Sequence, residues 1–344
     1  MRVMVTGNLG YIGTVLVPEL MNQNFDVVGL DSGYYQDCLL GDWQKPSYQI
    51  IKDVRHVNQD DFSSIDAVIH LAALSNDPLG ELAPGLTETI NLEATLRVAE
   101  LAKAAGVKRF VYSSSQSMYG VSETDDELDE DDSAKNPVTA YARTKWDAEC
   151  QLNLLNDDGF CVTHFRPSTV FGASPRLRCD IVFNNLVACA YTTGKIEIKS
   201  DGTPWRPVVH VKDVCSAYMA GLTAPVELIA ERAFNVGIKD GNYTVRELAE
   251  AAQKAVPGSE LVFTGEHNDQ RTYQVSFKRI LSELEGIYKP QWDLKKGGEE
   301  LVQFFKDTGF DETVFRGSIC TRLLTIKDSL DSGRINKELF INAS

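Results

Sequence analysis

The stretch that decides the fold is TGNLGYIG, residues 6–13, between an apolar segment, Arg2–Thr6, and a helical pattern from about Tyr11 to Asn22. Its three glycines allow a tight turn and let the backbone approach a pyrophosphate closely. The helix that follows would point its N–H groups and the positive end of its dipole at the phosphates. A strand, this turn and a helix in succession predict a dinucleotide-binding site.

Apolar segments and helical patterns alternate through the first half of the chain. Further strands are predicted at Phe25–Leu30, Tyr48–Ile51, Ala67–Leu71, Arg109–Ser113 and Phe160–Phe165, and further helices at Thr87–Ala105 and Ala140–Leu155. Continuous apolar strands separated by helices indicate a parallel sheet covered on both faces. The sequence predicts an α/β fold with a doubly wound parallel sheet (Rossmann) and a smaller C-terminal α/β substrate lobe.

Asp31 closes the second predicted strand and indicates which dinucleotide binds. A carboxylate there can accept hydrogen bonds from both hydroxyls of an adenosine ribose and would repel a 2′-phosphate. The residues that follow, Ser32–Tyr35, include no arginine for such a phosphate. Asp53, after the third strand, is placed to accept a hydrogen bond from the adenine amino group. The predicted cofactor is therefore NAD.

Beyond Pro167 the alternation loosens, and short elements are predicted at Phe234–Val236, Val245–Ala255 and Leu261–Phe263. We divide the chain into an NAD-binding Rossmann domain, 1–170, a substrate-binding lobe, 171–315, and a C-terminal helical tail, 316–344. The lobe is expected to be interleaved with the sheet, the part around 205–240 returning to the Rossmann domain.

Charge and composition exclude several classes of partner. The 344 residues carry a net charge of −15, which argues against a nucleic acid or an anionic membrane surface as partner. No segment approaches the roughly 20 apolar residues of a membrane span, and no secretory signal is apparent, so a cytoplasmic enzyme is expected. Seven scattered cysteines form no C-x-x-C pair, and five histidines show no metal-ligand spacing, so no metal site is expected.

Tyr141 and Lys145 lie one helical turn apart on one predicted face. A tyrosine has an ordinary pKa of about 10, and a lysine ammonium together with a positive nicotinamide ring favours its phenolate. Tyr141 is thus predicted to act as a general acid and base, and Lys145 also to hold the nicotinamide ribose. Ser115 follows the fifth strand, where its hydroxyl can share the substrate's proton with Tyr141.

These residues carry a family resemblance that extends to about residue 280. The landmarks are TGNLGYIG (6–13), Asp31, HLAAL (70–74), Asn91, SSSQSMYG (113–120), YARTK (141–145), FRPSTVFG (165–172) and WRPVVHVKD (205–213). The chain resembles the extended short-chain dehydrogenase/reductase family, in its nucleotide-sugar epimerase/dehydratase group. The resemblance implies bound NAD, a Ser115/Tyr141/Lys145 triad, a nucleoside diphosphate (NDP) sugar in the smaller lobe, and a homodimer formed through the helices of Asn91 and Tyr141.

The turn, Asp31 and the resemblance together define the expected contacts. Expected cofactor contacts are Gly7, Asn8, Gly10, Tyr11, Ile12, Gly13, Asp31, Ser32, Asp53, Val54, Leu71, Ala72, Ala73, Asn91, Ser113, Tyr141, Lys145 and Arg166. Expected substrate contacts are Ser75, Ser115, Gln116, Ser117, Thr169, Arg176, Arg178, Asn185, Arg206 and Arg271, the last and Arg206 on the diphosphate.

The residues after Ser115 distinguish the reactions of the resembled group. Sugar 4,6-dehydratases carry an Asp-Glu pair there, and UDP-glucuronate decarboxylases carry a Glu at the second position, where this chain has Gln116-Ser117. The 3,5-epimerase/reductases similar to GDP-fucose synthase use a Cys there and a later His, replaced here by Ser117 and Asp180. Elimination, decarboxylation and double epimerisation are therefore not supported.

Two reactions need only hydride transfer and one acid/base, namely inversion at C4 through a 4-keto intermediate and 4-keto reduction or its reverse. The preference for NAD favours the epimerase. Ser168-Thr169 in place of an Asn usual in galactose epimerases, and Gln116 in place of a small residue, leave the sugar open. A non-catalytic NAD-binding regulator would predict a broken triad, and this triad is complete.

Overall fold

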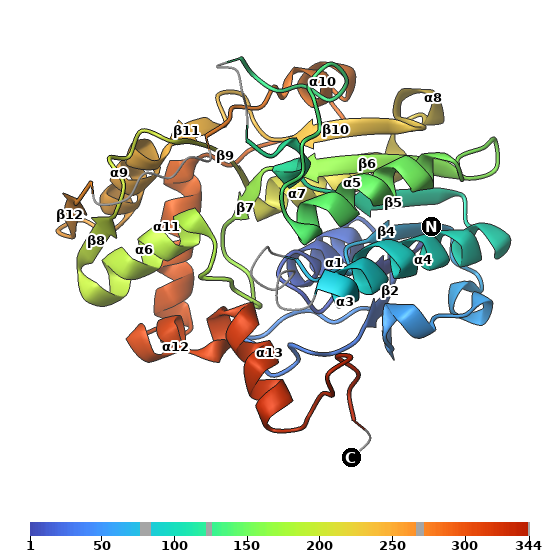
Figure 1. Cartoon of the computed structure of the whole chain (residues 1–344), viewed down its shortest axis with the longest axis horizontal. Helices are drawn as coiled ribbons and strands as arrows, with labels where there is room; N and C mark the ends of the chain where they lie inside the picture. The colour runs from blue at the N-terminus through green and yellow to red at the C-terminus, as the bar shows by residue number, and fades with distance from the viewer. Residues whose placement is uncertain (76–83, 122–125, 266–271, 343–344) are drawn as a thin grey trace.

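The computed structural model describes residues 1–75, 84–121, 126–265 and 272–342. Its centre is a seven-stranded, wholly parallel sheet in the order β10-β6-β5-β4-β1-β2-β3 (Figure 1). The strands are β1 (Arg2–Thr6), β2 (Asp26–Asp31), β3 (Tyr48–Ile51), β4 (Ala67–His70), β5 (Arg109–Ser113), β6 (Cys161–Pro167) and β10 (Arg232–Val236). This confirms the predicted doubly wound fold.

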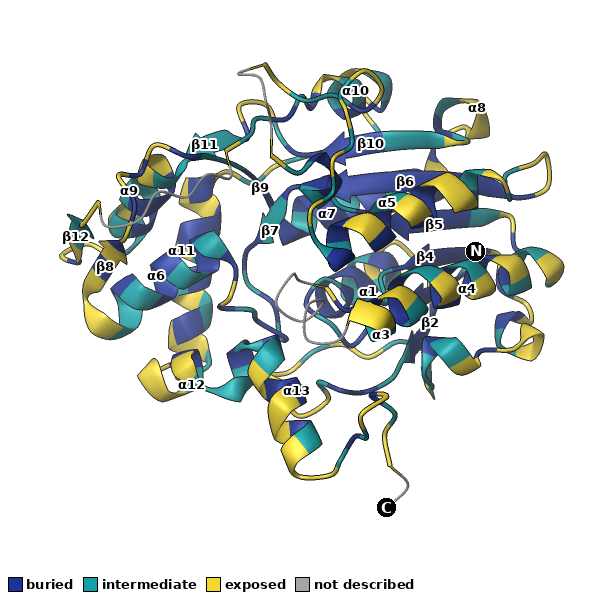
Figure 2. Ribbon diagram, viewed as in Figure 1, coloured by how far each residue is buried: buried dark blue, intermediate teal, exposed yellow. Residues whose placement is uncertain are grey.

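Helices cover both faces of the sheet, as buried strands of this kind require. On one face α1 packs against α7, and on the other α4 packs against α5. The sheet strands are mostly buried, while the outer faces of α4 and α5 are exposed (Figure 2). These helices are α1 (Gly13–Asn22), α4 (Ala94–Ala104), α5 (Ala140–Asn153) and α7 (Val211–Thr223).

The smaller lobe has two short sheets, β11-β9-β7 and β12-β8, packed with three helices. Its elements are β7 (Thr169–Phe171), α6 (Val182–Thr193), β8 (Lys195–Ile198), β9 (Trp205–His210), β11 (Asn242–Thr244), α9 (Val245–Ala255), β12 (Glu260–Phe263) and α11 (Leu294–Asp307). After β9 the chain leaves this lobe. It forms α7, which covers the main sheet, and β10, which joins that sheet as an edge strand, and it returns to the lobe at β11.

The remaining helices are short and lie mainly in the second half. They are α3 (Pro84–Glu88), α8 (Val226–Ile229), α10 (Lys278–Glu283), α12 (Glu312–Arg316) and α13 (Arg322–Asp331). Across the residues that the structure describes, no helix combines the length and the apolarity of a membrane span.

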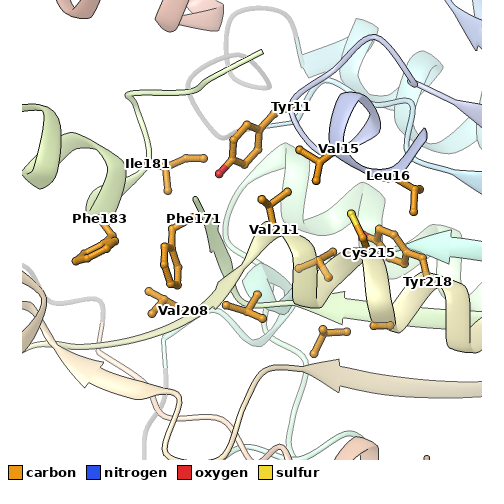
Figure 3. Close-up of a cluster of buried hydrophobic side chains, with 14 of the residues drawn as sticks. Tyr11, Val15, Leu16, Phe171, Ile181, Phe183, Val208, Val211, Cys215 and Tyr218 are labelled. Carbon is orange, nitrogen blue, oxygen red and sulfur yellow. The ribbon is translucent and has the colours of Figure 1, made fainter. Parts of the chain in front are cut away.

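One apolar cluster joins the two parts of the chain. Val15 and Leu16 of α1 and Cys215 and Tyr218 of α7 belong to the same buried cluster as Phe171 of β7 (Figure 3). Tyr11 reaches this cluster from the glycine turn and donates a hydrogen bond to the carbonyl of Gly172 at 2.8 Å. The turn is therefore fixed to the smaller lobe by packing that excludes water.

Two predicted helices differ from the observed ones. The first begins at Gly13 and not near Tyr11, because the turn continues through Ile12. The helix predicted over 87–105 contains a π-helical segment, Thr89–Glu93. That wider turn carries Asn91, whose side chain bonds both the N–H (2.8 Å) and the carbonyl (3.2 Å) of Leu74, beside the end of β4.

Gly221 allows α7 to approach the sheet closely, and its substitution tests this packing. A Cβ at this position would lie 2.8 Å from both Phe165 Cε2 and Val111 Cγ2. We expect Gly221→Ala to lower the free energy of unfolding by about 1–3 kcal/mol through overpacking. Urea denaturation measures this, and Thr223→Ala, on the exposed side of α7, is expected to change stability by less than about 0.5 kcal/mol. Equal effects would contradict the packing.

Candidate active site

A cavity of about 630 Å³ opens at the carboxyl edge of the parallel strands. Chain connections leave β1 toward β2 on one side and return at β4 on the other, so the cavity lies at the point where the winding direction reverses. Its wall continues into the smaller lobe through Thr169, Arg178 and Arg206. Most of the residues expected to bind cofactor or substrate line this cavity, in three groups.

The glycine turn forms the floor of the cavity. Gly7 has a φ of +71°, and a Cβ there would lie 2.7 Å from the backbone nitrogen of Ala72 at the end of β4. Only glycine meets both conditions, so the turn is pressed against the neighbouring strand and α1 begins directly beyond it. The expected cofactor contacts that line this part are Gly7, Gly10, Tyr11, Ile12, Gly13, Leu71, Ala72 and Ala73.

Asp31 lies at the second end of the cavity, together with Ser32, Asp53 and Val54. Its carboxylate accepts hydrogen bonds from the N–H groups of Leu9 (3.0 Å) and Gly33 (2.8 Å). Burial raises the pKa of Asp31, and these two donors oppose the rise. A carboxylate held in this way keeps further lone pairs for ribose hydroxyls.

Asp53 forms more hydrogen bonds within the protein than the sequence indicated. Its carboxylate accepts two hydrogen bonds from the Arg55 guanidinium, at 2.9 and 2.7 Å, and one from the Tyr34 hydroxyl at 3.1 Å. Burial alone would raise the pKa of Asp53, but Arg55 outweighs it and the pKa is lowered. Asp53 thus holds the loop around the cavity while also lining it.

The third part of the cavity holds the predicted acid/base group. Ser113 ends β5, Ser115 begins a single 3-10 turn, and Tyr141 and Lys145 lie on α5. Thr139 caps α5 by accepting a hydrogen bond from the N–H of Ala142 at 3.2 Å, which sets Tyr141 in the first turn. All four predicted residues line the cavity.

Lys145 is the buried charge of this group. Its Nζ donates to the carbonyl of Ser113 at 2.6 Å and lies 5.9 Å from the centre of the Tyr141 ring. Burial lowers the pKa of Lys145 to about 7, against the opposing effect of the Glu149 carboxylate. An ammonium so placed can stabilise a phenolate and can gain or lose its proton near neutral pH.

Two polar atoms on the cavity wall are buried without a partner. Within the described residues, the Gln116 Oε1 and Ser117 Oγ atoms form no hydrogen bond. The Gln116 amide nitrogen is fixed to the carbonyl of Arg166 at 3.0 Å, so its oxygen cannot turn away. Buried polar atoms left in this state suit hydroxyl groups of a ligand.

Thr169, Arg178 and Arg206 of the smaller lobe and Ser75, which follows β4, line another part of the cavity wall. The Arg178 guanidinium pairs with Asp180 at 2.9 Å through two hydrogen bonds and reaches Ser75 Oγ at 3.4 Å. Arg271 lies outside the described residues.

Arg166 is not among the residues that line the cavity, so its predicted cofactor contact stays a prediction. The side chain is 3% exposed, and its guanidinium forms a two-pronged ion pair with Glu149, the shortest contact being 2.6 Å. Burial would lower the pKa of Arg166, but Glu149 raises it, and the reciprocal interaction lowers the pKa of Glu149. The arginine instead ties β6 to α5.

Four other expected contacts also lie outside the cavity lining. Asn8 bonds the Gln49 side chain at 2.7 Å, and Asn91 bonds the backbone of Leu74. Asn185 donates to the carbonyl of Cys179 at 2.8 Å, and Arg176 donates to the carbonyl of Tyr35. These side chains bond protein groups around the cavity, although the Arg176 Nε atom has no hydrogen-bond partner within the described residues.

Several lining residues were not predicted from the sequence. Tyr34, Tyr35, Asp180, Ile181, Tyr273 and Arg322 all line the cavity. The sequence showed Arg322 only as one of several basic residues in a helical pattern far from any motif. For metals, the described residues contain no group of three or more His, Cys, Asp or Glu side chains that could hold an ion.

Fold and cavity together define an enzyme of the Rossmann type with a dinucleotide site and a Ser-Tyr-Lys group at its reactive end. The profile of the "NAD dependent epimerase/dehydratase family" matches residues 3–237, and the chain belongs to this family. The glycine turn, Asp31 and the cavity fit NAD, the cofactor on which the family depends.

Similar proteins of known name include more than one activity. A UDP-glucose 4-epimerase of Mycolicibacterium smegmatis is 30% identical over 325 residues, covering 89% of this chain and 99% of that one. UDP-glucuronic acid decarboxylase 1 of Arabidopsis thaliana is 24% identical over 325 residues, covering 92% and 72%. The structure of MoeE5 in complex with UDP-glucuronic acid and NAD is 27% identical with a TM-score of 0.74, covering 89% and 99%.

The role of Arg166 can be tested by removing its charge. Arg166→Met leaves Glu149 as an uncompensated buried carboxylate, and we expect a loss of about 3–5 kcal/mol in the free energy of unfolding. The double variant Arg166→Met/Glu149→Met should recover most of this loss. Urea denaturation measures both. A single variant with unchanged stability but weakened NAD binding would contradict this structural role and favour Arg166 as a cofactor contact.

The buried Lys145 ammonium makes stability depend on pH in a defined direction. Its folded pKa of about 7 lies below the unfolded value of about 10.4, so the folded state binds fewer protons between these limits and stability rises with pH. In the cofactor-free protein, we expect wild type to gain about 2 kcal/mol more than Lys145→Met from pH 7 to pH 9. Urea denaturation at both pH values measures the difference. An equal gain in both proteins would show that Lys145 is not buried as an ammonium.

Proposed function

We propose that the protein is an epimerase that inverts C4 of an NDP-hexose through a transient 4-keto intermediate. The observation that carries this proposal is the distribution of carboxylates along the cavity. Among the described lining residues they are Asp31, Asp53 and Asp180. The first two lie at the adenosine end, and Asp180 is paired with Arg178.

The reactive end therefore offers Tyr141 as its acid/base, with Ser115 and Lys145 as its neighbours. Gln116 and Ser117 stand where dehydratases and decarboxylases of this group carry acids. Elimination of water across C5 and C6 is served by a further carboxylic acid, and beyond the adenosine end the described lining residues offer only Asp180, which is paired with Arg178. Inversion at one carbinol needs one group that removes a proton and later returns it.

The residues of the chain then have defined tasks. Tyr141 takes the proton of the C4 hydroxyl as the carbinol is oxidised, and gives it back when the ketone is reduced on its other face. The Lys145 ammonium stabilises the phenolate, and the Ser115 hydroxyl donates to the same sugar oxygen. Bound NAD supplies the chemistry of accepting and returning one hydride.

The sugar nucleotide is recognised by cavity-lining residues other than Ser115, Tyr141 and Lys145. The unpartnered Gln116 Oε1 and Ser117 Oγ atoms are suited to sugar hydroxyls. Among the described residues of the smaller lobe, Arg206 and Arg178 are the arginines that line the same cavity, and arginine suits a diphosphate. The sequence relatives include UDP-glucose 4-epimerases, which supports a uridine nucleotide as the first substrate to test.

The proposal is tested by incubating the enzyme, as purified and with added NAD, with UDP-glucose, UDP-galactose, UDP-glucuronic acid and UDP-galacturonic acid. We expect one pair to interconvert without net NADH formation. Tyr141→Phe should lower kcat by about 10²–10⁴-fold, since it removes the acid/base while keeping the ring. Tyr191→Phe, a matched change in α6 away from the cavity, should leave kcat unchanged. Proton NMR identifies the products.

Three outcomes would contradict the proposal. A pentose product would indicate decarboxylation, and a 4-keto-6-deoxy product would indicate dehydration. Stoichiometric accumulation of NADH with an oxidised sugar would indicate a dehydrogenase.

A further inference from the structure

Arg322, the first residue of α13, is a buried arginine that forms no ion pair with any described carboxylate. It is 2% exposed and lines the cavity. Its Nη2 donates to the carbonyl of Arg176 at 2.8 Å, and its guanidinium lies 4.4 Å from the centre of the Tyr35 ring. Within the described residues, Nη1 forms no hydrogen bond and no carboxylate lies within ion-pair distance of the guanidinium.

A buried cation without a counter-ion is costly, so its retention needs an explanation. Burial lowers the pKa of Arg322, and the nearby Arg178 lowers it further, while Tyr35 opposes the shift. Asp180 pairs with Arg178 and also opposes the lowering of the Arg322 pKa, but within the described residues no carboxylate forms an ion pair with Arg322. An anion entering the cavity would neutralise Arg322 and would satisfy its unpartnered Nη1.

The position of Arg322 indicates which anion this is. The guanidinium acts electrostatically on Asp31 and packs on Tyr35, and both of these residues line the adenosine end of the cavity. With Asp31 on the ribose hydroxyls, the next negative group along NAD is the diphosphate. The structure thus assigns Arg322 as a cofactor-binding residue: we propose that its guanidinium binds the diphosphate of NAD on the adenosine side.

The tail that carries Arg322 is fastened to the loops that line the same end. Arg334 bonds Asp37 at 2.7 Å and the carbonyl of Tyr34 at 2.5 Å. Arg55 bonds the carbonyl of Glu338 at 2.8 Å and stacks on Phe340 at 3.7 Å. Figure 1 shows α13 beside the chain that follows β2. These contacts hold the part of the tail that follows Arg322 against the adenosine end of the cavity.

The inference rests on the NAD dependence of the family and not on the C4 reaction proposed above. Its test is the affinity of the full chain, stripped of nucleotide, for ADP-ribose, measured by calorimetry without any sugar. Arg322→Gln should weaken this affinity about 10- to 100-fold, as expected when a charge-assisted contact is lost. Arg322→Lys should recover part of the lost affinity, because lysine returns the positive charge but not the two-pronged hydrogen-bonding geometry of the guanidinium.

Two controls separate binding from structure. Arg316→Gln removes an equal charge from α12 at a residue whose side chain is 58% exposed, and should leave the affinity unchanged. Raising the salt concentration should weaken ADP-ribose binding more steeply in wild type than in Arg322→Gln, since a phosphate contact is screened. A merely structural role would leave this salt dependence unchanged and would overturn the proposal.

Two further results would also overturn it. If Arg322→Gln weakens NADP binding and spares NAD and ADP-ribose, the arginine serves a 2′-phosphate. If it weakens UDP binding and spares ADP-ribose, it serves the substrate. Absence of epimerase activity toward every sugar, with the ADP-ribose result as expected, would refute only the proposed reaction.

Discussion

The constraint on which the site depends is that seven parallel strands end at one edge, with β1 between β2 and β4. Parallel pairing places Thr6 beside Leu30 and His70, so the chain that leaves each strand emerges at the same level. The glycine turn, Asp31 and the segment after β4 are brought together in this way, although up to 65 residues separate them in the sequence. Ser113 and α5 extend the same edge toward the smaller lobe.

Lys145 is the charged residue that this sheet edge positions beside Tyr141. Its Nζ is fixed to the carbonyl at the end of β5, and Lys145 is only 3% exposed although it lines the cavity. The same burial that lowers its pKa makes its charge effective on neighbouring atoms. Stability is thus reduced at the site where charge stabilisation is needed, a common relation in active sites.

Much of the first half could be predicted from the sequence because its signals are local. Strand, glycine turn and helix succeed one another within residues 2–22, and Tyr141 and Lys145 share one helical face. The supporting residues could not be assigned in the same way. Arg166 stands in a family landmark, but its partner Glu149 lies 17 positions earlier and only the packing of α5 on β6 brings them together. Arg322 is separated from Asp31 by most of the length of the chain, and no local sequence pattern indicates that the two residues line the same cavity.

In the proposed reaction one acid/base, Tyr141, acts at one carbinol. Its most direct test is turnover of an interconverting NDP-hexose carrying deuterium at C4, run to equilibrium in ordinary water, with a parallel unlabelled reaction in D₂O. Proton NMR should show that the C4 deuterium is retained in both epimers and that no solvent deuterium enters C3 or C5. Loss of the C4 label, or incorporation of solvent deuterium at C3 or C5, would contradict the account.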